Sequence, residues 1–432
     1  MKTSLLKSMI ANGELDEKIA ALLELPTSDE RIPAYRDRWL SAVSAFEEIY
    51  GADRDAALFS VPGRSEIMGN HTDHQQGRVI AASITLDCIA VASKRDDSII
   101  RIKSEGFPED VVNIAEYTSP VESKFFRSEA IIAGVADGFR ESGLSVGGFD
   151  AYTTSNVLKG SGLSSSAAFE DMVGNILSHF YNNGSVSATS IAKIAQYAEN
   201  KFFGKPCGLM DQMACAWGGL ITIDFENKNS PETEGLGFDL TKKGYSLCIT
   251  DTGGNHADLN ADYASVPAEM KAVAKLLGHE VLCHVTYEQL IENASSIRRE
   301  CGDRAFLRAV HFVRETARVA KTADILRRDE LDGFLSAILA SGDSSYKYLQ
   351  NVYTVKNVEE QGLSLALCIT EGFLADKKAA WRVHGGGFAG TVQAFVPSEY
   401  ASDYRNLMDS VFGEGACMEL RIRSAGAVKV FE

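Results

Sequence analysis

The sequence predicts a globular protein of two domains, each of which combines helices with strands. The chain has 432 residues, and one hydrophobic core rarely serves more than about 100–200 residues, so two domains are expected. Its hydrophobic content of 45% and charged content of 24% are ordinary for globular proteins. Short β-branched runs and longer segments with helical spacing of apolar residues alternate along most of the chain.

The charge balance restricts the class of partner. The chain carries 43 Lys and Arg against 59 Asp and Glu, a net charge of −16. Such a surface repels nucleic acid and anionic membranes, so neither is expected as a partner. No stretch approaches the ~20 apolar residues that cross a bilayer, and polar residues break the N-terminal apolar run before it reaches signal-peptide length. We expect a cytoplasmic protein, a monomer or weak dimer.

The cysteine pattern is also typical of a cytoplasmic protein. All 8 are scattered along the chain, with no Cys-x-x-Cys pair and no histidine at zinc-ligand spacing. They are interpreted as buried, reduced thiols.

The first fifty residues predict a helical extension. Pro33 suits a helix start, apolar residues follow at intervals of three and four, and Gly51 closes the run. The apolar face packs on the domain that follows or, alternatively, binds a partner. The acidic, glycine-containing stretch 226–237 is the best boundary further on. The predicted units are therefore residues 1–50, 51–226 and 227–432.

Strands and helices are expected in a definite order after this extension. Candidate strands, recognised from β-branched runs between turn residues, are 58–61, 79–91, 99–102, 149–154, 218–225 and 245–250, with further strands around 384–395 and 418–430. Candidate helices are 128–142, the segment that follows Leu163, the segment 189–202 capped at Ser187, and several between 262 and 373.

One stretch, residues 158–170, joins a predicted strand to a predicted helix. Its sequence is Leu-Lys-Gly-Ser-Gly-Leu-Ser-Ser-Ser-Ala-Ala-Phe-Glu. Gly160 and Gly162 allow backbone N–H groups to approach an anion, and the helix N-terminus adds unpaired N–H groups and its positive dipole end. A flexible linker is the alternative, but a linker has no reason to lead directly into an amphipathic helix. The stretch therefore predicts a phosphate cradle. It lacks the Lys-Ser/Thr ending of a P-loop and the Gly-x-Gly-x-x-Gly of a Rossmann turn, so it belongs to neither class.

Four motifs, in order along the chain, resemble those of the GHMP small-molecule kinases, and of galactokinases in particular. They are Pro62-Gly-Arg-Ser-Glu-Ile-Met-Gly-Asn-His-Thr-Asp-His-Gln-Gln-Gly77, the Gly-Ser-Gly-Leu-Ser-Ser-Ser-Ala-Ala of the cradle, Pro206-Cys-Gly-Leu-Met-Asp-Gln212, and Gly385-Gly-Gly-Phe-Ala-Gly390. The resemblance implies the two-domain α+β GHMP kinase fold, with a ribosomal S5 domain 2-like N-terminal domain and a ferredoxin-like C-terminal domain. It also implies an ATP- and Mg²⁺-dependent sugar 1-kinase whose active site lies between the domains.

The resemblance assigns roles to individual residues. Asp211 corresponds to the catalytic aspartate, beside the anomeric hydroxyl, and Arg64 to the arginine that keeps it ionised. Sugar contacts are implied for Arg64, Asn70, His71, Asp73, Gly208, Asp211 and Tyr263. The plain alternatives are an exposed polar turn for Arg64, His71 and Asp73, and a helix-capping role for Asp211.

ATP and the metal are assigned in the same way. ATP contacts are implied for Lys159, Gly160, Ser161, Gly162, Leu163, Ser164, Ser165, Ser166 and Ala167. Mg²⁺ requires hard oxygen ligands, and the resemblance implies a hydroxyl of the serine run, with Ser165 as the candidate, together with Glu199. A solvated helix face is the alternative for Glu199.

Four positions depart from the galactokinase pattern. Galactokinases carry Asn where this chain has Glu66, and Glu where it has Asn70, while His74-Gln75 replaces Tyr-Asn. The matching glutamate contacts the C6 hydroxyl in galactokinases, so an altered C6 end of the pocket is one hypothesis. Galactose is the leading substrate, L-arabinose and galacturonate are alternatives, and compensation by Glu66 is the simpler explanation. A non-catalytic galactose sensor is a further alternative, disfavoured because the catalytic residues are present.

Overall fold

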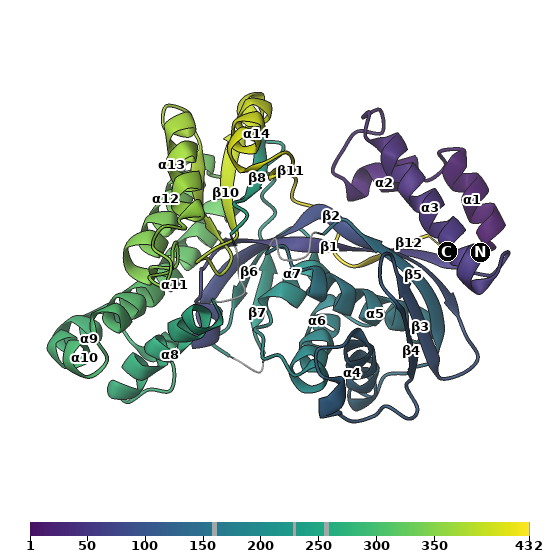
Figure 1. Cartoon of the computed structure of the whole chain (residues 1–432), viewed down its shortest axis with the longest axis horizontal. Coiled ribbons are helices and arrows are strands. Elements are labelled where there is room, and N and C mark those ends of the chain that lie inside the picture. The colour runs from purple at the N-terminus through teal and green to yellow at the C-terminus, as the bar shows by residue number, and fades with distance from the viewer. Residues whose placement is uncertain (158–161, 228–229, 255–258, 432) are drawn as a thin grey trace.

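Two long strands run across the molecule and carry most of its architecture. The computed structural model describes residues 1–157, 162–227, 230–254 and 259–431. Figure 1 shows β1 (Ala57–Met68) and β2 (Arg78–Lys94) crossing the centre as an antiparallel pair. The N-terminal helices lie near one end of this pair, and the C-terminal helices and a second sheet lie near the other.

In the described part of the chain, the first sheet has eight strands. Their order is β12-β1-β2-β5-β3-β4, and β6 and β7 extend from the other half of β2. The β3–β5 pairing is parallel, whereas the other pairings in this sheet are antiparallel. The other strands are β3 (Ile99–Ser104), β4 (Glu109–Asn113), β5 (Phe149–Ser155), β6 (Leu220–Asp224), β7 (Glu232–Gly235) and β12 (Val428–Phe431).

One face of this sheet is covered by helices that follow it in sequence. They are α4 (Ser128–Glu141), α5 (Ser165–Tyr181), α6 (Ala188–Tyr197) and α7 (Met210–Trp217). The core beneath them joins Phe59 and Val61 of β1 to Met172 and Ile176 of α5. Burial of these side chains fixes α5, and therefore its N-terminus, against the middle of β1, where the signature motif begins.

The opposite face is covered by two separate units. The N-terminal helices α1 (Thr3–Ala11), α2 (Asp16–Leu22) and α3 (Ile32–Tyr50) pack on one half, where Trp39 and Phe46 share a hydrophobic core with the strand residues Ile89 and Val91. Pro33 stands in the first turn of α3 and Gly51, at φ +96°, follows its end. The predicted helix and its packing on the sheet are thus confirmed.

A buried ionic cluster joins the N-terminal helices to the sheet. Arg38 of α3 donates to Asp87 Oδ1 at 2.5 Å, and Arg423 Nη1 lies 3.2 Å from Asp87 Oδ2. Asp87 and Arg423 are buried. Burial alone raises the pKa of Asp87, but the two guanidinium charges outweigh it, and the net pKa is lowered.

The other half of that face packs on the second sheet and its helices. This sheet has the order β11-β8-β10-β9 and is antiparallel throughout. Its strands are β8 (Tyr245–Asp251), β9 (Ala380–His384), β10 (Thr391–Pro397) and β11 (Cys417–Leu420). The surrounding helices are α8 (Asn260–Leu276), α9 (Tyr287–Glu292), α10 (Ala294–Glu300), α11 (Asp303–Arg327), α12 (Leu331–Ser344), α13 (Gly362–Leu374) and α14 (Ser398–Phe412). Ile67 and Ile80 of the first sheet share a core with Leu247 and Phe395 of the second.

Short helical turns complete the description. They are η1 (Asp73–Gln75), η2 (Glu122–Lys124), η3 (Ala198–Phe203), η4 (Leu282–His284) and η5 (Ser345–Leu349). Most predicted strands and helices before residue 251 occur close to their expected bounds, but the strand expected at 58–61 continues to Met68 as β1. The elements β4, β7, α7 and α14 were not predicted. The division at residues 226 and 227 stays a prediction, although β12, from the predicted second domain, pairs with β1.

The structure also tests the expectations about the cysteines and about membrane-spanning helices. All eight cysteines are free, as predicted, but Cys368 is exposed, so the expectation of uniform burial is wrong. No helix in the described ranges is long and apolar enough to cross a membrane.

Candidate active site

Arg64 and Asp211 form an ion pair at the junction of β1 and α7. Arg64 Nε donates to Asp211 Oδ1 at 2.8 Å, and Arg64 Nη2 lies 2.6 Å from the same oxygen. Arg64 is buried, whereas 35% of the Asp211 side chain is exposed. Burial lowers the pKa of Arg64, but the charge of Asp211 and their hydrogen bond outweigh it and the net pKa is raised. Arg64 lies within β1, so the prediction of a turn at this position is wrong.

The cradle is fastened to this ion pair. Arg64 N donates to Leu163 O at 3.0 Å and its guanidinium donates to Gly162 O. Ser164 Oγ donates to Asp211 Oδ2 at 2.6 Å. Asp211 lies in the first turn of α7, but its carboxylate bonds to Arg64 and Ser164, which disfavours the helix-capping alternative.

The cradle leads directly into a helix, as predicted. Gly162 and Ser164 have positive φ values of 69° and 62°, and α5 begins at Ser165. The side chain of Ser164, the N-cap residue, makes no capping hydrogen bond to this N-terminus. The unpaired N–H groups in the first turn of a helix suit an anion, and here Ser166 is exposed and Ala167 is buried. The predicted contacts Lys159, Gly160 and Ser161 lie outside the described residues.

Asp73 and Gly208 lie against each other. A Cβ atom on Gly208 would stand 2.3 Å from Asp73 Oδ2, so only glycine allows the carboxylate this close. Asp73 is in the turn η1, and its Oδ1 lies 3.2 Å from His74 Nδ1. Two residues predicted to bind the same ligand are thus brought together.

His71 links the signature to the glycine-rich third motif. His71 Nε2 lies 2.9 Å from Gly386 O, and its Nδ1 lies 3.1 Å from His74 Nε2. Burial, followed by the charge of His74, lowers the pKa of His71 to about 3, so the ring is neutral. A carbonyl only accepts, so His71 donates through Nε2 and accepts from His74 through Nδ1.

Tyr263 covers the same glycines from α8. Its hydroxyl donates to Gly387 O at 2.8 Å, and a Cβ atom on Gly386 would stand 2.7 Å from the tyrosine ring. Burial raises the pKa of Tyr263 to about 12, so the phenol is protonated and donates. His384, which directly precedes the third motif, lies near the cradle, because a Cβ atom on Gly162 would stand 3.6 Å from His384 Nδ1.

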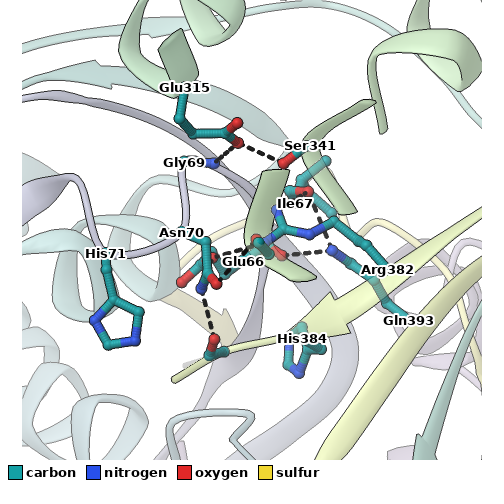
Figure 2. Close-up of polar contacts among 12 residues, drawn as sticks. Glu66, Ile67, Gly69, Asn70, His71, Glu315, Ser341, Arg382, His384 and Gln393 are labelled. Atoms are coloured by element: carbon teal, nitrogen blue, oxygen red, sulfur yellow. Dashed lines mark hydrogen bonds and ion pairs between the residues drawn. The ribbon is translucent and has the colours of Figure 1, made fainter. Parts of the chain in front are cut away.

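Asn70 is enclosed behind His71. The residue is fully buried, and its amide bonds to Glu66, to Gly385 O, to Ser345 of η5 and to Asn351 just after η5. Figure 2 shows Asn70 beside Glu66, with Arg382 on one side and His71 on the other.

Glu199 lies in a second group of buried carboxylates. It belongs to the turn η3 and is 3% exposed, which contradicts the solvated-face alternative. Gln212 Nε2 donates to Glu199 Oε2 at 2.9 Å and to Glu170 Oε2 at 3.0 Å, while Lys205 Nζ donates to Glu199 Oε1 at 2.8 Å. Burial, with the negative charge of Glu199, raises the pKa of Glu170 to about 8.

The carboxylate oxygens near Glu199 meet the needs of a hard cation only in part. Among the described residues, no group of three or more His, Cys, Asp or Glu side chains could hold a metal ion. No hydrogen bond joins Ser165 to Glu199, both of which are described. Mg²⁺ in kinases takes one or two protein oxygens and fills its remaining positions with phosphates and water. A buried carboxylate that Gln212 links to Glu170 of α5, the helix that follows the cradle, fits this pattern.

Comparison with known proteins places this geometry in a family. The family model of the GHMP kinases N terminal domain matches residues 130–219, and the galactokinase galactose-binding signature matches residues 44–94. A galactokinase of Actinobacillus pleuropneumoniae serotype 3 is 30% identical over 372 residues, 85% of this chain and 92% of that protein. The chain belongs to the galactokinase family. A galactokinase of Streptomyces coelicolor is 28% identical over 384 residues, 88% of this chain and 94% of that protein.

Solved structures agree on the fold. Lactococcus lactis galactokinase complexed with galactose superposes with a TM-score of 0.75 at 24% identity and covers 89% of this chain and 98% of that one. Methanococcus jannaschii mevalonate kinase gives a TM-score of 0.58 at 15% identity, covering 85% and 98%. The GHMP kinase fold implied by the motifs is confirmed, and the chain is a sugar kinase of the galactokinase family.

Sequence reasoning missed the residues that support the site from behind. Gln212 joins two carboxylates, Glu170 lies on the buried side of α5, and Arg382 reaches Glu66 from β9. Polar residues inside an apolar helical pattern, such as Glu170, are the available signal, but spacing alone does not identify their partners.

Proposed function

We propose that this protein is an ATP-dependent galactose 1-kinase. The γ-phosphoryl group of ATP passes to the anomeric hydroxyl of galactose, which gives galactose 1-phosphate and ADP. The bond from the γ-phosphorus to the bridging oxygen of ADP breaks as the bond to the sugar oxygen forms, and the hydroxyl loses its proton.

One observation carries this proposal. The hydrogen bond of 2.6 Å from Ser164 to Asp211 joins the carboxylate to the residue that precedes the open N-terminus of α5. A hydroxyl held by Asp211 therefore lies next to a group held by the anion site. Nucleophile and phosphoryl group would be aligned by the protein before reaction, which supplies much of the rate in phosphoryl transfer.

Asp211 would orient the anomeric hydroxyl and accept its proton. Arg64, buried and paired with Asp211, would keep the carboxylate ionised and aimed. Phosphoryl transfer has a loose transition state that needs little base assistance, so we assign Asp211 chiefly an orienting role.

ATP would be held by residues 159–167 of the cradle. The N–H groups at the start of α5 would bind phosphate oxygens, and Ser164 and Ser166 would add hydroxyl donors. We propose that Mg²⁺ is held by Glu199 and a serine hydroxyl, with Ser165 as the candidate. When bound, the ion neutralises charge on the phosphates.

The sugar would lie among the signature residues. Asp73, held by His74 and packed against Gly208, would accept hydrogen bonds from the sugar hydroxyls. His71 and Tyr263, both fixed on the third motif, would form the adjoining wall. We also propose that the enzyme acts in the cytoplasm, as a monomer or weak dimer.

The test is ADP release from Mg-ATP with galactose, galacturonate, L-arabinose and N-acetylgalactosamine. We expect strong turnover of galactose that requires Asp211. Sugar binding without ADP release for any sugar would instead favour the non-catalytic sensor, and preferential turnover of galacturonate or L-arabinose would overturn the choice of galactose.

A further inference from the structure

Glu66 and Asn70 exchange the residue types expected at their two positions. The galactokinase pattern has an amide at the first position and a carboxylate at the second, whereas this chain has the carboxylate first. The two side chains touch, since Asn70 Nδ2 donates to Glu66 Oε1 at 2.9 Å (Figure 2). The exchange therefore keeps one carboxylate and one amide in contact.

Every hydrogen-bonding group of the Asn70 amide is used inside the protein. Its Nδ2 donates to Gly385 O at 2.6 Å as well as to Glu66. Its Oδ1 accepts from Asn351 Nδ2 at 2.7 Å and from Ser345 Oγ at 3.3 Å. An amide has two donor hydrogens and two acceptor positions, so none remains for a ligand. Asn70 is also 0% exposed.

Glu66, in contrast, keeps a free oxygen. Its Oε1 accepts from Asn70 and lies 3.7 Å from Arg382 Nη2, but its Oε2 accepts no hydrogen bond from any described residue. Its side chain retains 8% exposure, and its Oε2 is not among the buried atoms that lack a partner. This oxygen is the acceptor that the pair leaves available.

Strand geometry directs Glu66 toward the candidate site. Arg64 and Glu66 pair in regular register with Ser83 and Ala81 of β2, so their side chains leave β1 on the same face. Burial raises the pKa of Glu66, and the guanidinium charges of Arg382 and Arg64 oppose this rise.

We propose that Glu66, and not Asn70, presents the carboxylate that accepts a hydroxyl of the sugar remote from Asp211, with Asn70 as its positioning residue. The proposal rests on the sugar kinase function above and deepens it. Arg382, which is fully buried, faces Glu66 and offsets its negative charge. The substrate is then a neutral sugar, because a substrate carboxylate in this place would meet Glu66.

The experiment compares the wild type with Glu66→Gln, which keeps the shape of the side chain and an oxygen for Asn70. Substrates are galactose and three analogues that lack one group: 6-deoxygalactose, 2-deoxygalactose and L-arabinose. We expect Glu66→Gln to lower kcat/KM for galactose by about tenfold to a hundredfold, chiefly through KM. For the analogue that lacks the contacted hydroxyl, variant and wild type should agree within about twofold.

A matched control uses another buried carboxylate of the same network. Glu315 accepts from Gly69 N at 3.2 Å and from Ser341 Oγ, and it is fully buried. Glu315→Gln should change kcat/KM by the same factor for all four sugars. An equal loss for all four sugars in Glu66→Gln, or no loss for galactose, would overturn the proposal.

A second variant and a binding measurement complete the test. Glu66→Asp shortens the side chain but keeps its charge, so it replaces Glu66→Gln if that variant does not fold, with the same expectation. If the wild type phosphorylates no sugar, the proposed kinase function is wrong, but the role of Glu66 in sugar binding can still be tested. The measurement is then the sugar-dependent shift of the melting temperature of the same proteins. A shift that is smaller in the variant for galactose, but equal for one analogue, would support it; equal differences for all would not.

Discussion

Arg64 and Asp211 lie 147 residues apart in sequence, yet Arg64 Nε donates to Asp211 Oδ1 at 2.8 Å in the structure. This pair fastens the first strand of the large sheet to the first turn of α7, and the backbone of the same arginine holds Leu163. One residue thus fixes the relative position of the sugar signature, the cradle and the candidate catalytic carboxylate.

Asp211→Asn should lower kcat by about 10²–10⁴-fold with little change in ATP affinity. The amide cannot accept a proton, and it pairs poorly with the buried Arg64. ADP release and ATP titration calorimetry measure the two quantities. Asp224→Asn is the control, because Asp224 forms an ion pair with Arg78 at 2.6 Å outside the proposed site. Retention of most activity in Asp211→Asn would contradict the assignment.

Much of this arrangement could be predicted from the sequence. The strand before Arg64, the helix after Ser164 and the grouping of Asp73 with Gly208 follow from apolar spacing and motif resemblance. The position of Arg64 inside β1 could not be predicted, because Pro62 and Gly63 imitate a turn although the chain continues as a strand with register shifts beside it. The enclosure of Asn70 depends on residues more than 270 positions away, which no local pattern contains.

Ser164 should tolerate glycine better than alanine. Its φ of 62° costs a residue with a Cβ atom about 1–2 kcal/mol, and glycine avoids this cost. We expect the unfolding free energy of Ser164→Gly to exceed that of Ser164→Ala by about 1 kcal/mol in urea titrations. Both variants lose the hydrogen bond to Asp211, so both should lose a similar factor in kcat. Equal stability of the two variants would rule out backbone strain at this position.

Glu199→Gln should raise the Mg²⁺ concentration required for half-maximal rate by about 10–100-fold. The variant keeps a side chain of the same size beside Gln212 but removes the anionic ligand and the partner of Lys205. Rates at fixed ATP and varied Mg²⁺ measure the effect. Glu234→Gln changes an exposed carboxylate and should leave the Mg²⁺ dependence unchanged. An unchanged dependence in Glu199→Gln would exclude Glu199 as a ligand.

Arg38→Met should make the protein more sensitive to acid. The folded-state pKa of Asp87 is below its unfolded value, so its stabilisation is present above about pH 4 and is lost as pH falls through the folded pKa. Removing one of two cations raises that pKa, so acid unfolding moves to higher pH and stability at pH 7 falls by about 3 kcal/mol. Circular dichroism during acid titration measures the midpoint.

The control for this change lies on the same helix. Arg36 pairs with Asp16 in a partly exposed position, so Arg36→Met should cost less than about 1 kcal/mol. Equal acid midpoints for the two variants would show that the buried cluster does not couple the N-terminal helices to the sheet.

Asn70→Asp should destabilise the protein by about 3 kcal/mol, since a carboxylate would then face Glu66 and the carbonyl of Gly385. Adding Glu66→Gln restores an amide opposite a carboxylate. The double variant should therefore be at least about 1 kcal/mol more stable than the sum of the single effects predicts. Urea unfolding of the four proteins gives this coupling, and strict additivity would mean that the two side chains act independently.

The strand β12, at the C-terminal end of the chain, completes the large sheet, whose other strands in the described part of the chain lie between Ala57 and Gly235. Residues 428–431 form the neighbour of β1, Val430 O accepts from Lys18, and the buried Arg423 just before the strand reaches Asp87. On the ribosome, β1 keeps an unpaired edge, and Asp87 lacks one of its cations, until this segment has emerged. Cotranslational folding of the front half thus waits for synthesis of the back half, and a nonsense codon shortly before residue 428 would damage the N-terminal helices as well.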